Sequence, residues 1–219
     1  MRKTPMKTIL FFTLLLPGLL FAQSADSQVA ELQHDWAIAN YELSGDAQET
    51  AFEKLIAKAD AAVASNARSA DLLIWNGIIK SSFAGAKGGL GALSLAKDAR
   101  DSLEAALKVD DKALAGSAYT SLGTLYSNVP GWPVGFGNDK KAVQLLEKAL
   151  EINPDGIDSN YFYADYLLSK KEFEEAEKYL LKAQNAAPRP DRPVADAGRH
   201  REILAALSVT RDKLKHSGS

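Results

Sequence analysis

The side chains of this chain that can do acid–base, nucleophilic or metal chemistry do not form a catalytic pattern. The three histidines, His34, His200 and His216, are never three or four residues apart, the spacing at which two of them would act together as metal ligands on a helix. There is no Gly-x-Ser-x-Gly elbow and no cysteine. Four glutamates between residues 172 and 177 stand together with Lys170, Lys171 and Lys178, which is typical of a solvated helix face. The sequence therefore predicts a protein that is not an enzyme and that holds no metal or cofactor.

A glycine-rich segment around Lys87 has a superficial likeness to a phosphate-binding loop. Gly85, Gly88, Gly89 and Gly91 surround this lysine. The order G-x-x-x-x-G-K-[ST] is missing, however, and no strand is predicted before the segment. Small residues also allow helices or loops to cross closely, and we interpret the segment in that way.

Basic side chains are concentrated near the C-terminus. They are Arg189, Arg192, Arg199, His200 and Arg201. One interpretation is that they pair with acidic neighbours such as Asp191, Asp196 and Glu202. The other is that they contact an anion or an acidic partner. The sequence leaves both interpretations open.

The apolar pattern that must position these side chains repeats along the chain. Ala142, Leu146, Ala149 and Pro154 recur 34 residues later as Ala176, Leu180, Ala183 and Pro188. The alanines let a neighbouring helix approach, the leucine fills the groove between them, and the proline ends the helix. Tyr119, Leu122, Gly123 and Tyr126 fit the pattern W-x-x-L-G-x-x-Y of a preceding helix. These spacings resemble the tetratricopeptide repeat (TPR), a helix pair that stacks into a solenoid.

The predicted fold is all-α, a right-handed TPR-type helical solenoid of about four helix pairs with a C-terminal capping helix. The expected pairs are 27–43 with 47–65, 69–84 with 92–109, 112–127 with 138–153, and 157–169 with 173–186. Prolines after residue 188 predict an extended passage, followed by the capping helix over about 194–213. The expected domains are a cleaved signal peptide at 1–22, the solenoid at 23–215 and a disordered tail at 216–219.

Two inserts interrupt the regular repeat, and each is expected between the two helices of its pair. The first covers residues 82–93 and the second residues 127–138. Because they occupy equivalent places in adjacent repeats, we expect them on the same edge of the solenoid. The second holds Pro130, Trp132, Pro133 and Phe136 among three glycines. Its tryptophan either tucks between helices, as large aromatic side chains usually do, or faces a partner.

The concave groove of a TPR solenoid is lined mainly by the first helix of each pair. Counting from the small residue at the eighth position places the following in the groove: Asp71, Ile74, Ile78, Ser81 and Ser82; Ser117, Thr120, Thr124, Ser127 and Asn128; Asp158, Tyr161, Asp165, Leu168 and Ser169. This surface carries hydroxyls and no cation, which favours a weakly polar ligand or a partner helix. The candidate binding residues are Ile74, Ile78, Thr120, Thr124, Asn128, Pro130, Trp132, Pro133, Phe136, Tyr161 and Asp165.

The N-terminus has the form of a secretory signal. Arg2, Lys3 and Lys7 precede an apolar run over residues 9–16, which Pro17 and Gly18 end. An uncleaved anchor is the alternative, although the run is short for a membrane span. Without a cysteine the chain cannot be a lipoprotein of the usual kind, so we expect a soluble periplasmic protein with no membrane span in its mature part. Cleavage removes three positive charges from a chain whose formal net charge is −2, leaving no electrostatic footprint for nucleic acid.

Two segments carry a more specific resemblance. They are V-P-G-W-P-V-G-F-G at 129–137 and K-K-A-V-Q-L-L-E-K-A-L-E-I-N-P at 140–154. They resemble periplasmic TPR-like proteins related to the T component of TRAP transporters, over nearly all of the mature chain. The resemblance implies an accessory partner of a periplasmic solute-binding protein, with a hydrophobic ligand, and makes 130–133 an interaction candidate. Members are often lipoproteins, a point at which this chain departs from the family.

Two functions therefore remain open from the sequence. The first is a non-catalytic scaffold that binds another periplasmic protein through its groove and its two inserts. The second is a T-component-like accessory protein of a solute transporter that binds a solute-binding protein, a hydrophobic small ligand, or both.

Overall fold

The computed structural model describes residues 24–217, apart from the side chains of Leu90 and Ser217, and this part of the chain is helical without any strand. The predicted signal peptide at 1–22 and the last two residues of the predicted tail lie outside the described residues. The helices are α1 (Ala25–Tyr41), α2 (Gly45–Ser65), α3 (Ala70–Lys87), α4 (Gly89–Val109), α5 (Ala113–Asn128), α6 (Asp139–Ile152), α7 (Ile157–Ser169), α8 (Phe173–Gln184) and α9 (Pro193–Ser217). The predicted all-α, TPR-like solenoid is confirmed.

The repeated small and large positions form the core between the helices of each pair. Leu103, Leu146 and Leu180 are fully buried at equivalent places on α4, α6 and α8. The alanines on either side of each leucine are buried as well: Ala99 and Ala106, Ala142 and Ala149, Ala176 and Ala183. Each leucine therefore packs as a large knob between two small residues, which sets the close approach of the paired helices.

Side-chain caps fix where several helices begin. The hydroxyl of Ser69 accepts a hydrogen bond from the backbone N–H of Leu72 at 3.3 Å, and the amide oxygen of Asn138 accepts one from Lys141 at 2.9 Å. Each cap satisfies a donor that would otherwise be left over in the first turn. The start of α5 is irregular, because Leu114, Ala115 and Gly116 have positive φ, so its regular turns follow Gly116.

The first insert is not a loop, which corrects the prediction for residues 82–93. Its alanines and leucines extend α3 to Lys87 and form the first turns of α4. The break falls at Gly88 and Gly89, whose φ values of 62° and 64° lie in the left-handed region that glycine adopts without strain. The extra residues therefore lengthen both helices, and α3 and α4 have 18 and 21 residues against 13 and 12 in α7 and α8.

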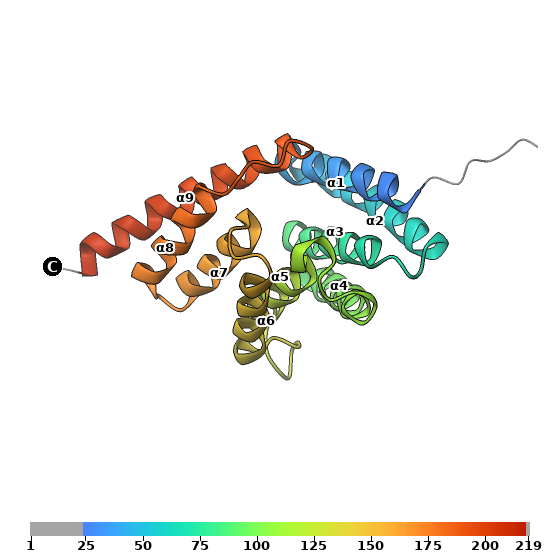
Figure 1. Ribbon diagram of the computed structural model, residues 1–219. Helices are drawn as coiled ribbons and strands as arrows, with labels where there is room; N and C mark the ends of the chain where they lie inside the picture. The colour runs from blue at the N-terminus through green and yellow to red at the C-terminus, as the bar shows by residue number, and fades with distance from the viewer. Residues whose placement is uncertain (1–23, 218–219) are drawn as a thin grey trace, which may run out of the picture.

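The solenoid curls until its two ends meet. The first helices of the pairs contact one another in order, α1 with α3, α3 with α5 and α5 with α7. Helix α9 packs on α7 and α8 and also reaches α1 (Figure 1). It runs to Ser217, so residues 216 and 217 are helical, beyond the predicted domain boundary at 215. The capping helix therefore closes the inner face of the solenoid as well as covering its end.

Candidate binding site

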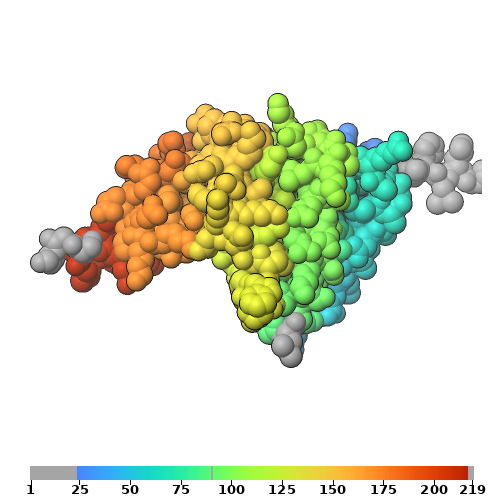
Figure 2. Space-filling model, turned by 90° about the horizontal axis from the view of Figure 1, so that it is seen from below, coloured from blue at the N-terminus to red at the C-terminus, as the bar shows by residue number. Residues whose placement is uncertain are grey.

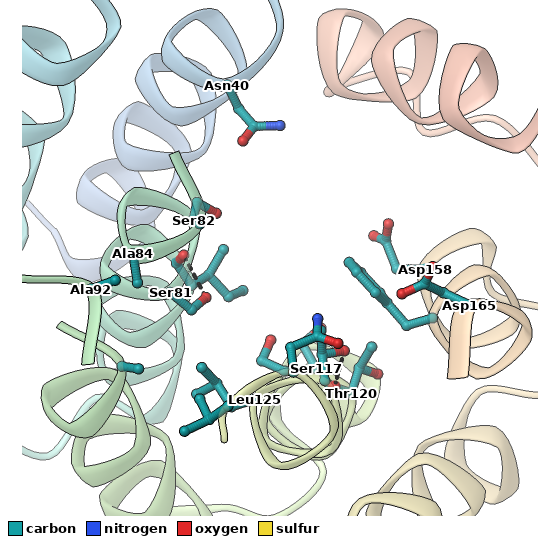
Figure 3. Close-up of a pocket in the computed structure, with 18 of the residues that line it drawn as sticks. Asn40, Ser81, Ser82, Ala84, Ala92, Ser117, Thr120, Leu125, Asp158 and Asp165 are labelled. Atoms are coloured by element: carbon teal, nitrogen blue, oxygen red, sulfur yellow. Dashed lines mark hydrogen bonds between the residues drawn. The ribbon is translucent and has the colours of Figure 1, made fainter. Parts of the chain in front are cut away.

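A pocket of about 590 Å³ lies on the inner face, where α1, α3, α4, α5, α7 and α9 surround it. Figure 3 shows Asn40, Ser82, Ser117 and Asp158 facing this space from four different helices. The volume lies within the range of small-molecule sites, which is about 300–1,000 Å³.

The pocket gathers most of the residues that the sequence singled out. Those that line it are Ile78, Thr120, Thr124, Asn128, Pro130, Tyr161 and Asp165. Ile74 is fully buried in the helix core instead, because its side chain turns toward α4 and α5. Trp132, Pro133 and Phe136 are not among the lining residues. The two inserts do lie side by side, since Gly85 and Leu93 line the pocket together with Val129 and Val134.

Three of the hydroxyls that line the pocket are bonded within their own helices. Ser81 donates to the carbonyl of Ile78 at 2.9 Å, and Ser117 donates to that of Leu114 at 2.6 Å. Thr124 donates in the same way to the carbonyl of Thr120 at 2.9 Å. These three side chains therefore present oxygen lone pairs and carbon to the pocket, and its wall is less polar there than the residue types suggest.

Aromatic rings form two of the walls. Trp36 and Trp75 meet edge to face with their centroids 5.6 Å apart, and the indole N–H of Trp36 donates to Ser82 Oγ at 2.9 Å. On the opposite side, Tyr161 and Phe162 meet in the same manner at 5.2 Å. Such walls suit a ligand with a flat or aliphatic apolar body.

An ion-pair network closes the pocket between α7 and α9. Arg199 donates to Asp158 Oδ1 at 2.9 Å and pairs with Glu202. Arg189 donates to Asp158 Oδ2 at 2.6 Å and to Asp196 Oδ1 at 2.7 Å. A further bond reaches α1, because the hydroxyl of Tyr41 donates to Glu202 at 3.2 Å.

This network shifts the pKa values of its members. Burial alone would raise the pKa of Asp158, but the guanidinium groups of Arg199 and Arg189 hold it well below its usual range. Burial likewise raises the pKa of Asp165, and the more distant charge of Arg199 lowers it only in part. Asp165 has no hydrogen-bond partner among the described residues.

Two statements from the sequence need correction here. The groove is not free of cations, because Arg192 and Arg199 line it. They come from the C-terminal region, which the counting of groove positions on first helices could not include. Pairing with acidic neighbours holds for Arg189 and Arg199, although Asp158, far away in the sequence, is the partner that they share.

The second insert is an ordered loop with an exposed tip. Its backbone is held by hydrogen bonds from Gly137 to the carbonyl of Pro130 at 3.0 Å and from Asn138 to that of Tyr126 at 2.9 Å. Phe136 packs on Tyr126, their centroids 5.3 Å apart. Trp132 does not tuck between helices, as 90% of its surface is exposed. The loop projects from the edge of the molecule, in yellow in Figure 2.

Comparison with known proteins finds one family match. Residues 137–199 match the tetratricopeptide repeat family model, a segment that runs from α6 to the first turns of α9. No curated protein matches the chain. Tetratricopeptide repeats are typically non-catalytic scaffolds that bind other proteins. Among residues 24–217, no helix has the length and apolar character needed to cross a membrane, and no group of three or more acidic or histidine side chains could hold a metal ion.

Proposed function

We propose that this protein is a non-catalytic binding protein of the periplasm that holds a small, mainly apolar ligand inside its solenoid. The observation that carries the proposal is the pocket of about 590 Å³ with aromatic walls. The hydroxyls of Ser81, Ser117 and Thr124 are bonded to their own helices, so an apolar body does not need to break new hydrogen bonds at these positions on entering. The predicted signal peptide and the lack of cysteine support a soluble periplasmic form.

The closure by α9 favours a small ligand over a partner helix in the groove. A helix with its side chains is about 10–12 Å across and needs an open channel along its whole length. Here α9 contacts both α1 and α7, so the inner face is bounded at both ends of the solenoid. A compact ligand needs no such channel.

Filling the pocket should abolish binding of an uncharged apolar probe. Thr124 faces the pocket from the middle of α5, and Thr124→Trp would place an indole in the ligand volume. We expect the affinity for phenylnaphthylamine, measured by its fluorescence on titration, to fall by about tenfold or more, which corresponds to about 1.4 kcal/mol.

A matched variant separates filling of the pocket from general effects of a new tryptophan. Gln144 is exposed on α6 and does not line the pocket, so Gln144→Trp should bind the probe as the wild type does. Ala92→Phe fills the pocket from α4 and should repeat the loss. Binding that survives both filling variants would count against the proposed function.

A second candidate function is docking of another protein on the loop at 129–138. It is supported by the repeat family match and by the exposed side chains of Trp132 and Val134, 90% and 64% exposed. Tryptophan is enriched among the residues that dominate protein interfaces. Under the transporter-accessory hypothesis the partner is a periplasmic solute-binding protein.

Trp132→Ala should weaken such docking and leave the fold unchanged. Because the side chain is almost fully exposed, we expect the free energy of unfolding to change by no more than about 0.5 kcal/mol. Affinity for a periplasmic solute-binding protein, measured by biolayer interferometry, should fall by about tenfold or more. Val209→Ala removes another exposed apolar side chain, on α9, and should leave affinity unchanged. Equal affinities for the two variants would refute docking at the loop.

A further inference from the structure

Arg192 is the guanidinium of the pocket that has no acceptor. It lines the pocket just before α9, and its Nε is enclosed without a hydrogen-bond partner. Its backbone N–H donates to the carbonyl of Arg189 at 2.9 Å, but neither Nη1 nor Nη2 of the guanidinium has a hydrogen bond or an ion pair within residues 24–217. An enclosed donor left in this state costs free energy unless something else supplies the acceptor.

Three carboxylates act on the charge of Arg192, but Asp191 forms no hydrogen bond or ion pair with it in the described part of the chain, and the oxygens of the other two accept from other arginines. Asp196 accepts from the backbone N–H and the side chain of Arg189. Asp158 accepts from Arg189 at one oxygen and from Arg199 at the other. Arg192 therefore feels these charges without bonding to them.

The ring of Trp75 fixes the position of this free guanidinium. The Cζ atom of Arg192 lies 5.0 Å from the ring centroid, a cation–π contact. The indole N–H of Trp75 is also enclosed without an acceptor. Burial and the neighbouring charge of Arg189 lower the pKa of Arg192, although Asp158 and Asp196 oppose this. The pocket thus has a preplaced donor group at one corner and apolar walls elsewhere.

We propose, as a deepening that rests on the proposed function, that the ligand is an amphipathic organic acid whose oxyanion is bound by Arg192. The planar guanidinium matches the two oxygens of a carboxylate, and the same geometry accepts a phosphate or sulfonate. The apolar remainder of the ligand lies along Ile78, Leu125 and Phe162. The sequence leaves open whether the basic residues pair with acidic neighbours or contact an anion. Of these residues, Arg192 alone is the one that we propose contacts an anion.

Asp165 sets the orientation of this ligand. It is the carboxylate of the pocket without a partner, and it lies two turns along α7 from Asp158, on the side of Tyr161. An anion beside it would be repelled, so the charged end is directed to Arg192. Removing the charge of Asp165 should strengthen binding of an anion, which is the opposite sign to removal of Arg192.

Two probes with the same ring system test the proposal. Anilinonaphthalene sulfonate carries an anion, and phenylnaphthylamine is its uncharged analogue. We expect the wild type to bind the sulfonate about tenfold more tightly than phenylnaphthylamine in fluorescence titrations. The signal of Thr124→Trp, whose pocket is filled, is subtracted as the background. Arg192→Gln should remove this preference and leave phenylnaphthylamine affinity within about twofold. Arg201→Gln, a charge change at an exposed position of α9 that does not line the pocket, should keep the preference.

The outcomes separate this inference from the function on which it rests. Equal binding of the two probes by the wild type, or an equal loss of both in Arg192→Gln, overturns the anion site and leaves the apolar pocket standing. Failure of both probes to bind the wild type overturns the pocket function and the anion site together. If Arg192→Gln does not fold, Asp165→Asn decides the matter, because tighter binding of the sulfonate alone supports the proposal and no change refutes it.

Discussion

Replacing Arg199 by methionine is expected to lower the free energy of unfolding by about 3 kcal/mol, at the lower end of what removal of one partner from a buried ion pair costs. The guanidinium is only 7% exposed, whereas its partners Asp158 and Glu202 are 33% and 38% exposed. Asp158 keeps its ion pair with Arg189, and water can solvate both carboxylates in part, which moderates the loss. Methionine keeps apolar contact with Tyr161 and Phe162, whose ring centroids lie 4.4 Å from the guanidinium carbon.

Urea unfolding followed by circular dichroism measures this loss, and Arg211→Met is the matched control. Arg211 also lies on α9 and also forms an ion pair, with Glu177, but its side chain is 51% exposed. Exposed pairs of this kind contribute about 0–1 kcal/mol. Because Arg199 joins α9 to α7, its loss should also weaken binding of phenylnaphthylamine. A cost below about 1 kcal/mol for Arg199→Met would mean that the network does not hold the pocket closed.

The repeating helices could be predicted because their signal is local. Whether Leu146 and Leu180 face a neighbouring helix depends on spacing within about two turns, and the small residues beside them leave little choice of partner. The helix bounds therefore followed from the sequence to within a few residues, and the repeated positions form the core as expected.

The structure of the first insert was harder to predict, because only two of its residues depart from helical geometry. Glycine is compatible with a loop, a turn or a helix, so the several glycines of residues 82–93 suggested irregular structure. Gly85 and Gly91 nevertheless lie within α3 and α4, and Gly88 and Gly89 alone make the break. No local signal distinguishes Gly88 and Gly89 from Gly85 and Gly91, because the position of the break depends on how α3 packs on α4.

The closure of the pocket depends on contacts between distant parts of the chain. Asp158 and Arg199 are 41 residues apart, and Tyr41 and Glu202 are 161 apart. The curvature that brings them together is a sum of small rotations between repeats, which no motif encodes. The concentration of arginines after residue 188 was visible in the sequence, but its place inside the pocket was not.

The second large effect is expected at Gly123, where α5 and α6 approach closely. Gly123 lies within α5 with ordinary helical φ, so helix propensity alone predicts that Gly123→Ala stabilises the protein by about 0.5–1 kcal/mol. Packing predicts the opposite. A Cβ at this position would lie 2.6 Å from Cγ of the fully buried Leu146 and 3.1 Å from the carbonyl oxygen of Ala142. We expect overpacking to prevail and to cost about 1–3 kcal/mol, measured by urea unfolding.

Gly85→Ala is the matched control, because it is also a glycine within a helix but a Cβ there would meet nothing within 4 Å. The same substitution should therefore raise the free energy of unfolding by about 0.5–1 kcal/mol at Gly85, where only propensity acts. Opposite signs at the two positions would establish that close approach, and not the absence of a side chain, is what Gly123 provides. Stabilisation at both would mean that α6 can move away from α5 at little cost. In that case Thr120 and Thr124 on α5 would not be held in place either, and the pocket that they line could change shape at little cost in free energy.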